Sequence, residues 1–354
     1  MKKILIIRMS SLGDVLIASP LIRALRRHFL EAQIDFVVRK EYAEVIRYNP
    51  HLTNVIEFDI STGLVGLWKL RKKIWQTKYD IILDIHRNFR SRLICWSFKN
   101  LFNRKTIIRT VRKNYFLRFL LVYFKLNLYK KFHGCVIKVW QKYLQVAQPL
   151  GIKPDNLGIE LFLNDEAESV VQILFTEIKS RKWKIVIAPG AKHFTKRWPA
   201  EYFADLIRKF FTKYKSQIIL VGGPEDREVT AQVTSTIPDI PVLSMVGNYT
   251  ILQTAAIIKH ANLFIGNDSG LTHVAAAFKI PTVAIFGSTV EEFGFFPENP
   301  NAIVVENNRL NCRPCSHIGR AKCPKKHFKC MREITPENVF DKALDLLLHT
   351  ELHT

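Results

Sequence analysis

The sequence is poor in several features, and each shortage excludes a class of protein. Six cysteines among 354 residues are too few for a disulfide-based scaffold, so we expect a reducing, cytoplasmic environment. No apolar run reaches the roughly 18 residues that a membrane-spanning helix requires; the longest, Phe116–Tyr129, is interrupted by Arg118 and Lys125. The apolar stretch Ile4–Ile7 ends at Arg8 and is shorter than the core of a signal peptide. We therefore predict a globular protein that is neither secreted nor inserted in a membrane.

Acidic residues are scarce in the first half of the chain, which makes the protein strongly basic. The 53 Lys and Arg exceed the 31 Asp and Glu by 22. Residues 1–160 hold 30 basic and 11 acidic side chains, whereas residues 161–354 hold 23 and 20. No acid lies between Asp84 and Asp155, while sixteen basic residues lie from Arg87 to Lys153. We expect this half to meet a polyanion, which could be a nucleic acid, an anionic membrane face or a phosphorylated substrate.

What the sequence does contain is a regular alternation of short apolar runs and amphipathic stretches. This alternation is typical of parallel sheets that are covered by helices on both faces. The predicted strands are Lys3–Arg8, Ile34–Val38, Asp80–Asp84, Lys184–Ala188, Gln217–Val221, Leu263–Ile265 and Thr282–Phe286. The predicted helices are Pro20–Phe29, Glu41–Tyr48, Ala200–Lys213, Glu225–Ser235, Ile251–His260, Leu271–Phe278 and Pro336–His349.

The stretch Gln148–Glu168 is the predicted domain boundary, because Pro, Gly and Asn are frequent there and the charge balance changes. We predict an N-terminal Rossmann-like domain over residues 1–160, a C-terminal Rossmann-like domain over 161–335 and a C-terminal helix over 336–354. The predicted fold class is α/β, with two doubly wound domains that face each other across a cleft.

The first candidate site directly follows the first predicted strand and comprises Ser10, Ser11, Gly13 and Asp14. Ligands of open α/β sheets collect beyond the carboxyl ends of strands, where Gly13 permits close approach and Asp14 could deprotonate a bound hydroxyl. The alternative is that Asp14 caps a helix and stabilises its dipole. The loop contains neither GxGxxG nor GxxxxGK[ST], so it is neither a dinucleotide fingerprint nor a P-loop.

Two further candidate sites lie in the second half. Ala188–Pro199 places Lys196 and Arg197 at a helix entrance, which suits an anion, although a solvated basic loop explains them equally well. Phe264–Ala277 reads as a strand, a tight polar turn and a helix. We expect the amides of Ser269 and Gly270 to face an anion, His273 to reach the same point, and Asp268 to bind sugar hydroxyls; the alternative for His273 is a histidine satisfied within the fold. A Ser/His/Asp triad for acyl transfer is disfavoured, because these residues share one local turn without a nucleophile elbow.

The fourth group consists of cysteines near the C-terminus, spaced Cys312-x2-Cys315-x7-Cys323-x6-Cys330. The first pair has the spacing of half a zinc site, but the second pair is too widely spaced for the common pattern. Both a structural zinc ion and reduced thiols that pack a loop remain open. The surrounding stretch Arg309–Arg332 holds eight basic residues and no acid.

Taken together, these segments resemble glycosyltransferase family 9, the ADP-heptose:lipopolysaccharide heptosyltransferases. The resemblance covers the whole chain and is carried by KILIIRMSSLGDVLIASP, PGAKHFTKRWP, LVGGPEDRE, IGNDSGLTHVAAA and CRPC…CPKKHFKCM. It implies a GT-B fold, with the acceptor bound by the N-terminal domain and the nucleotide-sugar donor by the C-terminal domain. It also implies an inverting single displacement that needs neither a metal ion nor a cofactor.

The resemblance assigns roles to individual residues. Asp14 would be the general base in an acceptor loop with Ser10, Ser11 and Gly13, and Lys196 would stabilise the departing ADP. Tyr249 lies where related proteins contact adenine. The residues expected to bind the donor are Thr195, Glu225, Asp268, Ser269, Gly270 and His273.

We therefore predict heptose transfer from ADP-L-glycero-D-manno-heptose to the phosphorylated inner core of lipopolysaccharide, at the cytoplasmic face of the inner membrane. The protein would be a peripheral membrane protein, with Tyr115–Tyr129 as the stretch that touches the bilayer. The predicted partners are the donor, the anionic acceptor and the membrane surface, and not nucleic acid, since no helix-turn-helix, zinc-finger or RNP signature occurs. The alternatives are another nucleotide-sugar donor, a basic nucleic-acid-binding protein, or a sugar-nucleotide epimerase or hydrolase of similar fold. The position of the added heptose remains open.

Overall fold

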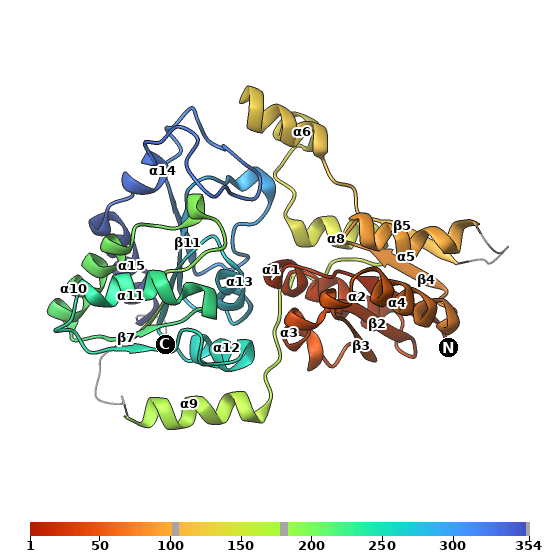
Figure 1. Ribbon diagram of the computed structural model, residues 1–354, viewed down its shortest axis with the longest axis horizontal. Coiled ribbons are helices and arrows are strands. Elements are labelled where there is room, and N and C mark those ends of the chain that lie inside the picture. Colours follow the sequence, from red (N-terminus) through yellow and green to blue (C-terminus); the bar gives the residue numbers. More distant parts are fainter. Residues whose placement is uncertain (101–105, 178–182, 352–354) are drawn as a thin grey trace. The chain divides into compact units, whose positions relative to one another are not determined.

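The chain folds into two compact units, each built on its own parallel sheet (Figure 1). The computed structural model describes residues 1–100, 106–177 and 183–351. Unit 1 comprises residues 1–113 and 138–162, and unit 2 comprises residues 114–137 and 163–354. The predicted α/β class is confirmed.

Unit 1 contains a five-stranded sheet of order β3-β2-β1-β4-β5, in which every neighbouring pair is parallel. Its strands are β1 (Lys3–Ile7), β2 (Gln33–Arg39), β3 (Asn54–Phe58), β4 (Ile81–Asp84) and β5 (Ile107–Thr110). The residues of β1 from Ile4 to Ile7 are completely buried, because side chains that alternate in direction are covered on both faces of the sheet. On one face, helix α4 (Gly63–Thr77) packs Leu67 and Ile74 against Leu5 and Ile7.

The helices of unit 1 connect these strands and lead to the second unit. They are α1 (Leu12–Leu16), α2 (Ser19–His28), η1 (Lys40–Tyr42), α3 (Glu44–Arg47), η2 (Ile60–Thr62), α4 (Gly63–Thr77), α5 (Phe89–Asn100), α8 (Val139–Ala147) and η4 (Gln148–Leu150). The predicted helices near residues 20–29 and 41–48 are present. Ser19 is the first residue of α2, and the additional short helix α1 precedes it.

Unit 2 contains a six-stranded parallel sheet of order β11-β10-β9-β6-β7-β8. Its strands are β6 (Lys184–Ala188), β7 (Gln217–Leu220), β8 (Val242–Ser244), β9 (Leu263–Asn267), β10 (Thr282–Phe286) and β11 (Ala302–Glu306). The chain builds this sheet outward from β6, first to β7 and β8 on one side and then to β9, β10 and β11 on the other. This is the doubly wound Rossmann order, and its switch point lies between β6 and β9. Ligands of such sheets bind at this switch point, beyond the carboxyl ends of the two strands.

The helices of unit 2 bury one large core against the sheet. They are α6 (Tyr115–Phe119), η3 (Leu120–Phe124), α7 (Tyr129–His133), α9 (Asp165–Glu177), η5 (Phe194–Lys196), α10 (Ala200–Tyr214), η6 (Pro224–Asp226), α11 (Arg227–Ser235), α12 (Ile251–Lys259), α13 (Gly270–Ala277), η7 (Glu291–Phe293), α14 (Lys329–Arg332) and α15 (Pro336–Glu351). The predicted C-terminal helix α15 is not a separate part, because Val339 and Ala343 are buried in the same core as Phe203 and Ile185. Among the described residues, no helix is both long and apolar enough to cross a membrane.

The sequence analysis missed four strands, β3, β5, β8 and β11, and each of them is the edge strand of its sheet. Edge strands are partly exposed, so their sequences lack the continuous apolar run that marks a buried strand. In β5 (IIRT) all four residues are at least partly exposed, whereas those of β4 (IILD) are all buried.

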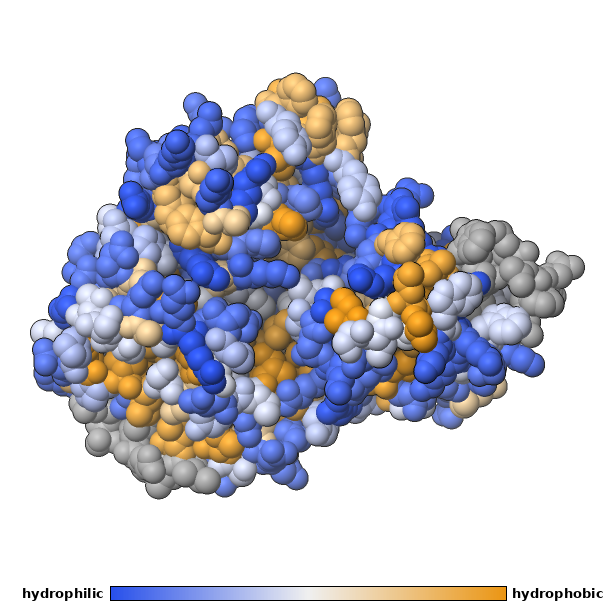
Figure 2. Space-filling model, in the orientation of Figure 1, coloured by the Kyte–Doolittle hydropathy of each residue, from blue (hydrophilic) through white to orange (hydrophobic). Residues whose placement is uncertain are grey.

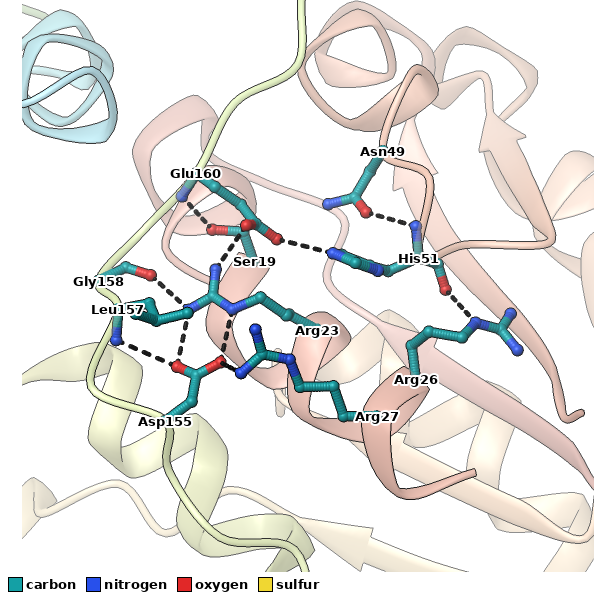
Figure 3. A network of polar contacts seen from close by, with 10 residues as sticks. All are labelled: Ser19, Arg23, Arg26, Arg27, Asn49, His51, Asp155, Leu157, Gly158 and Glu160. Carbon is teal, nitrogen blue, oxygen red and sulfur yellow. Dashed lines mark hydrogen bonds and ion pairs between the residues drawn. The ribbon is translucent and has the colours of Figure 1, made fainter. Parts of the chain in front are cut away.

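The predicted boundary near residue 160 coincides with a segment that is tied to unit 1 by ionic contacts (Figure 3). Arg23 on α2 donates two hydrogen bonds to Asp155, at 2.6 and 2.8 Å, and a third to the carbonyl of Gly158 at 2.8 Å. It also pairs with Glu160 at 2.6 Å. Because the Arg23 side chain is 4% exposed, the last segment of unit 1 is held by a largely buried network.

Residues 114–137 belong to unit 2, although the sequence analysis predicted one continuous domain over residues 1–160. Its residues Leu117, Leu121 and Tyr129 pack against Phe293 of unit 2. The ammonium group of Lys125 donates to the carbonyl of Pro314 at 2.7 Å, also in unit 2. The chain therefore leaves unit 1 after residue 113 and returns to it at residue 138.

Candidate functional site

The most developed candidate site lies at the switch point of unit 2, where the loops after β6 and β9 meet. Asn267, the last residue of β9, is completely buried between them. Its Oδ1 accepts the backbone N–H of Trp198 at 3.0 Å, and its Nδ2 donates to the carbonyl of Pro189 at 2.8 Å. The hydroxyl of Thr272 donates to the Asn267 carbonyl at 2.7 Å. The side chain of Asn267 thus ties the loop after β6 to the end of β9, and its backbone carbonyl holds the start of α13 (Gly270–Ala277).

Lys196 and Asp268 form an ion pair at the centre of this site. The Lys196 Nζ lies 2.7 Å from the Asp268 Oδ2, and the side chains are 16% and 8% exposed. Thr289, beyond the end of β10, donates its hydroxyl to the same carboxylate oxygen at 2.6 Å. An ammonium group held this way in a poorly solvated site can stabilise a phosphate strongly. The structure brings together two predicted site residues and adds Thr289, which the sequence analysis did not identify.

Ser269, Gly270 and His273 lie at the beginning of α13. Ser269 is the N-cap residue, and its hydroxyl is a buried group without a hydrogen-bond partner within the described chain. A buried polar atom of this kind is available to bind a ligand or a water molecule. Gly270 begins the helix, and His273 is 6% exposed one turn further on.

Thr195 lies beside Lys196, but its side chain is turned toward the cysteine-bearing loop. It is 1% exposed, and its hydroxyl accepts the backbone N–H of Arg320 at 2.8 Å. Its own N–H donates to the Arg320 carbonyl at 3.1 Å. In the structure, Thr195 therefore positions the loop that carries Lys196.

Glu225 is exposed in η6, after β7, whereas the next residue lies closer to the loops of the site. The Asp226 carboxylate covers Gly190, where an added Cβ would come within 2.0 Å of it. It also accepts the N–H of Gly223 at 3.1 Å, and burial raises the pKa of Asp226. The sequence signal for Asp226 is the GGPED run, in which Gly222 leaves room for its side chain. Tyr249, partly buried, directly precedes the cap of α12.

In unit 1, a second group of interacting polar side chains surrounds Asp14, which follows β1. Its Oδ1 pairs with Arg8 at 2.6 Å and accepts the hydroxyl of Tyr143 at 3.2 Å. Its Oδ2 accepts the hydroxyl and the N–H of Ser11, at 3.0 and 3.3 Å. Ser10 is partly exposed and Gly13 is buried in the same loop. The contact with the Ser11 N–H is also the capping interaction considered from the sequence, so the capping and functional interpretations are compatible.

The charge of Arg8 governs the protonation of Asp14. Burial by itself would raise the pKa of Asp14, but the attraction of Arg8 and the hydrogen bonds from Arg8 and Ser11 outweigh it, so the pKa lies below its ordinary value. Nearby, burial and the charges of Arg8 and Lys113 lower the pKa of His86 to about 3, which leaves the imidazole neutral. Its Nδ1 accepts the N–H of Met9 at 2.9 Å. The sequence analysis did not assign a role to Arg8.

A basic cavity of about 560 Å³ opens in unit 1 at the carboxyl ends of β4 and β5. Asp84 is its one acid, and its carboxylate accepts the N–H of Arg87 at 2.7 Å and the hydroxyl of Ser91 at 2.9 Å. Three arginines face apolar side chains here, which suits an anion joined to an apolar or sugar group. The lining residues are Asp84, Arg87, Phe89, Arg92, Leu93, Cys95, Ile108, Thr110 and Arg112.

The four C-terminal cysteines gather around a cavity of about 300 Å³ in unit 2. None is in a disulfide, and Cys312 Sγ lies 3.9 Å from His327 Nε2. Burial raises the pKa of Cys315, and it raises the pKa of Cys330 to about 12, so both are protonated thiols. Within residues 1–100, 106–177 and 183–351, no three His, Cys, Asp or Glu side chains are arranged to hold a metal ion.

Comparisons with known proteins agree with this picture. A model of glycosyltransferase family 9 (heptosyltransferase) matches residues 67–326. The lipooligosaccharide heptosyltransferase 2 of Campylobacter jejuni is 27% identical over 350 residues, which are 96% of this chain and 97% of that protein.

Two solved structures cover almost the whole chain. A glycosyltransferase family 9 protein from Veillonella parvula matches with a TM-score of 0.79 and 23% identity over 98% of each chain. The Escherichia coli ADP-heptose lipopolysaccharide heptosyltransferase II matches with a TM-score of 0.75 and 20% identity, over 99% of this chain and 100% of that chain. At these identities the structures show the fold, which is GT-B as expected.

Proposed function

The chain belongs to glycosyltransferase family 9, the heptosyltransferase family, and on that premise we propose that it transfers L-glycero-D-manno-heptose from an ADP donor to the phosphorylated inner core of lipopolysaccharide. The observation that carries the proposal is the Lys196–Asp268 pair at the switch point of unit 2. The names of the similar proteins, one acting on lipooligosaccharide and one on ADP-heptose, support the acceptor and donor classes.

Unit 2 would bind the donor through the loops after β6 and β9. Lys196 would give up part of its contact with Asp268 and bind the diphosphate instead. Asp268 would accept hydrogen bonds from hydroxyl groups of the sugar. The unpartnered hydroxyl of Ser269 and the backbone amide of Gly270 would bind phosphate oxygens at the start of α13.

Unit 1 would supply the general base. Asp14, kept ionised by Arg8, would accept the proton of the acceptor hydroxyl, which takes the place of the Ser11 hydroxyl on Oδ2. The acceptor oxygen then forms a bond to the anomeric carbon while the bond from that carbon to the ADP oxygen breaks. The electron pair leaves with ADP, and Lys196 stabilises the new charge. Attack from the side opposite the leaving group inverts the anomeric centre, and no metal ion or cofactor enters the step.

The phosphate groups of the acceptor would bind in the basic cavity of unit 1. Arg87, Arg92 and Arg112 line it, and most of the excess of basic residues lies in this unit, with 26 Lys and Arg against 11 Asp and Glu. The reaction would take place at the cytoplasmic face of the inner membrane, where the protein acts as a peripheral membrane protein.

Replacing the proposed base tests the assignment. The Asp14→Asn variant, incubated with ADP-heptose and an inner-core acceptor, should lose about 10²–10⁴-fold in transfer rate, because the amide cannot take the proton. Its affinity for ADP, measured by calorimetry, should stay within twofold of wild type. Asp59→Asn is the matched control: Asp59 also accepts a serine N–H and hydroxyl in unit 1, but at an exposed turn.

Two outcomes would contradict the proposal. Normal transfer by Asp14→Asn would remove Asp14 from the base role. Rapid ADP release by the wild-type protein without any acceptor would instead favour a hydrolase or epimerase.

A further inference from the structure

Large apolar side chains are concentrated on the outer surface of residues 114–137, which we call the aromatic hairpin. This segment of 24 residues holds seven of the twenty exposed large apolar side chains of the described chain. Figure 2 shows the hydrophobic colour gathered over α6. The seven are Tyr115, Phe116, Phe119, Tyr123, Phe124, Leu126 and Phe132, with exposures from 49% to 67%.

The opposite face of the hairpin is anchored to unit 2. Leu117 and Leu121, one helical turn apart, are buried against Phe293. Lys125 donates to the carbonyls of Cys312 and Pro314 at 3.2 and 2.7 Å. The inner face of the hairpin is therefore packed against the rest of unit 2, and this packing holds the exposed aromatic side chains of the outer face in place.

The aromatic hairpin and the cysteine-bearing loop, residues 309–332, form one surface. Both line the same cavity of about 300 Å³, the hairpin through Val122, Tyr123 and Lys125 and the loop through Arg320 and Lys325, among others. The hairpin contains four basic residues and the loop eight, and neither contains an acid. The exposed lysines of this surface are Lys125, Lys130, Lys131, Lys322, Lys325, Lys326 and Lys329.

We propose that this surface docks unit 2 on an anionic phospholipid bilayer; the proposal rests on the proposed function, whose acceptor is a lipid. Exposed aromatic rings beside flexible lysines suit the headgroup region, where rings insert and ammonium groups reach the phosphates. A second copy of the chain fits less well, because a symmetric contact would oppose the same basic residues.

This assignment places the membrane contact on the unit that carries the Lys196–Asp268 pair. Charge alone would place it on unit 1, where most of the basic excess lies. The docking surface is distinguished by the combination of exposed rings and basic residues on one support, which charge counts do not reveal.

Vesicle sedimentation tests the proposal without donor or acceptor. Wild-type protein should bind vesicles of equal parts phosphatidylglycerol and phosphatidylethanolamine, and bind phosphatidylcholine vesicles far less. Phe116→Ser/Phe124→Ser should lower the partition coefficient about tenfold, since two inserting rings are lost. Lys130→Gln/Lys131→Gln should lower it by about tenfold or more at low salt.

Matched variants of unit 1 are the controls: Leu64→Ser/Val65→Ser removes equally exposed apolar groups, and Lys72→Gln/Lys73→Gln removes an exposed lysine pair. Both should bind vesicles like wild type. Three results would overturn the proposal: equal losses of vesicle binding in the controls, unchanged binding by the hairpin variants, or a dimer in sedimentation that only Phe116→Ser/Phe124→Ser dissociates. Transfer to a delipidated acceptor should be unchanged in the hairpin variants. Absence of transfer in wild type would instead count against the proposed function, whatever the vesicles show.

Discussion

At the scale of single residues, the chemistry proposed for unit 2 depends on one ammonium group. Lys196 is held 2.7 Å from Asp268 in a site of low exposure, where its charge is weakly screened. Replacing it by methionine, which keeps much of its volume, should lower kcat by about 10²–10³-fold, because the departing diphosphate loses its counter-charge. Steady-state transfer assays at saturating acceptor measure this effect.

The matched control for Lys196→Met is Lys192→Met, at an exposed lysine of the same loop. It changes the net charge equally, so it should leave kcat within about threefold of wild type. If both variants lost the same activity, general attraction of the donor would explain the result and the specific role of Lys196 would be wrong.

At the scale of elements, the segment that ends unit 1 depends on Arg23 of α2. Its guanidinium is almost completely buried and contacts Asp155, Gly158 and Glu160. Arg23→Met removes the most buried partner of two carboxylates, so it should lower the free energy of unfolding by about 3 kcal/mol. Arg27→Met removes a contact to the same Asp155 oxygen from a side chain that is 54% exposed, and should cost less than about 1 kcal/mol. Urea denaturation of both variants measures the difference, and equal losses would contradict it.

The same network predicts how stability depends on pH. The hydrogen bond from Arg23 is the main reason that the pKa of Asp155 lies below its ordinary value. A carboxylate with a lowered pKa binds fewer protons in the folded state, so its contribution is present above the unfolded pKa of about 3.9 and is lost as pH falls through the folded pKa. Wild type should therefore lose stability more steeply than Arg23→Met between about pH 5 and pH 3. Parallel urea midpoints across this range check the slope.

At the scale of the whole molecule, the loops proposed to bind the donor belong to unit 2 and the Asp14 loop to unit 1. ADP should therefore slow amide hydrogen exchange in residues 189–198 and 267–273, and leave residues 8–14 unchanged. The bound nucleotide adds about 2.7 kcal/mol to the stability of the folded state when its concentration is a hundred times its Kd. The protection from exchange is therefore measurable by mass spectrometry. UDP at the same concentration is the control. Protection by UDP and not by ADP would overturn the donor.

The parts of the fold that could be predicted from the sequence are those whose signal is local. Buried central strands such as β1 and β6 are continuous apolar runs, and the turn Asn267–Gly270 between β9 and α13 has a distinctive residue order. The edge strands escaped because partial exposure removes that run. The contacts of Thr289 with Asp268 and of Arg8 with Asp14 were missed, because no local sequence pattern marks a contact across strands or between a strand end and a helix.

The sequence by itself determined the α/β class, the two Rossmann-like units, the loops that carry Asp14, Lys196 and Asp268, and the family. Only the tertiary structure decided which side chains meet: Arg8 with Asp14, Lys196 with Asp268, and Arg23 with Asp155. It also decided that residues 114–137 belong to unit 2, although they continue the basic composition of unit 1. The physical reason is that composition and periodicity record burial and charge along the chain, whereas long-range packing selects the neighbour that each buried or charged group finds.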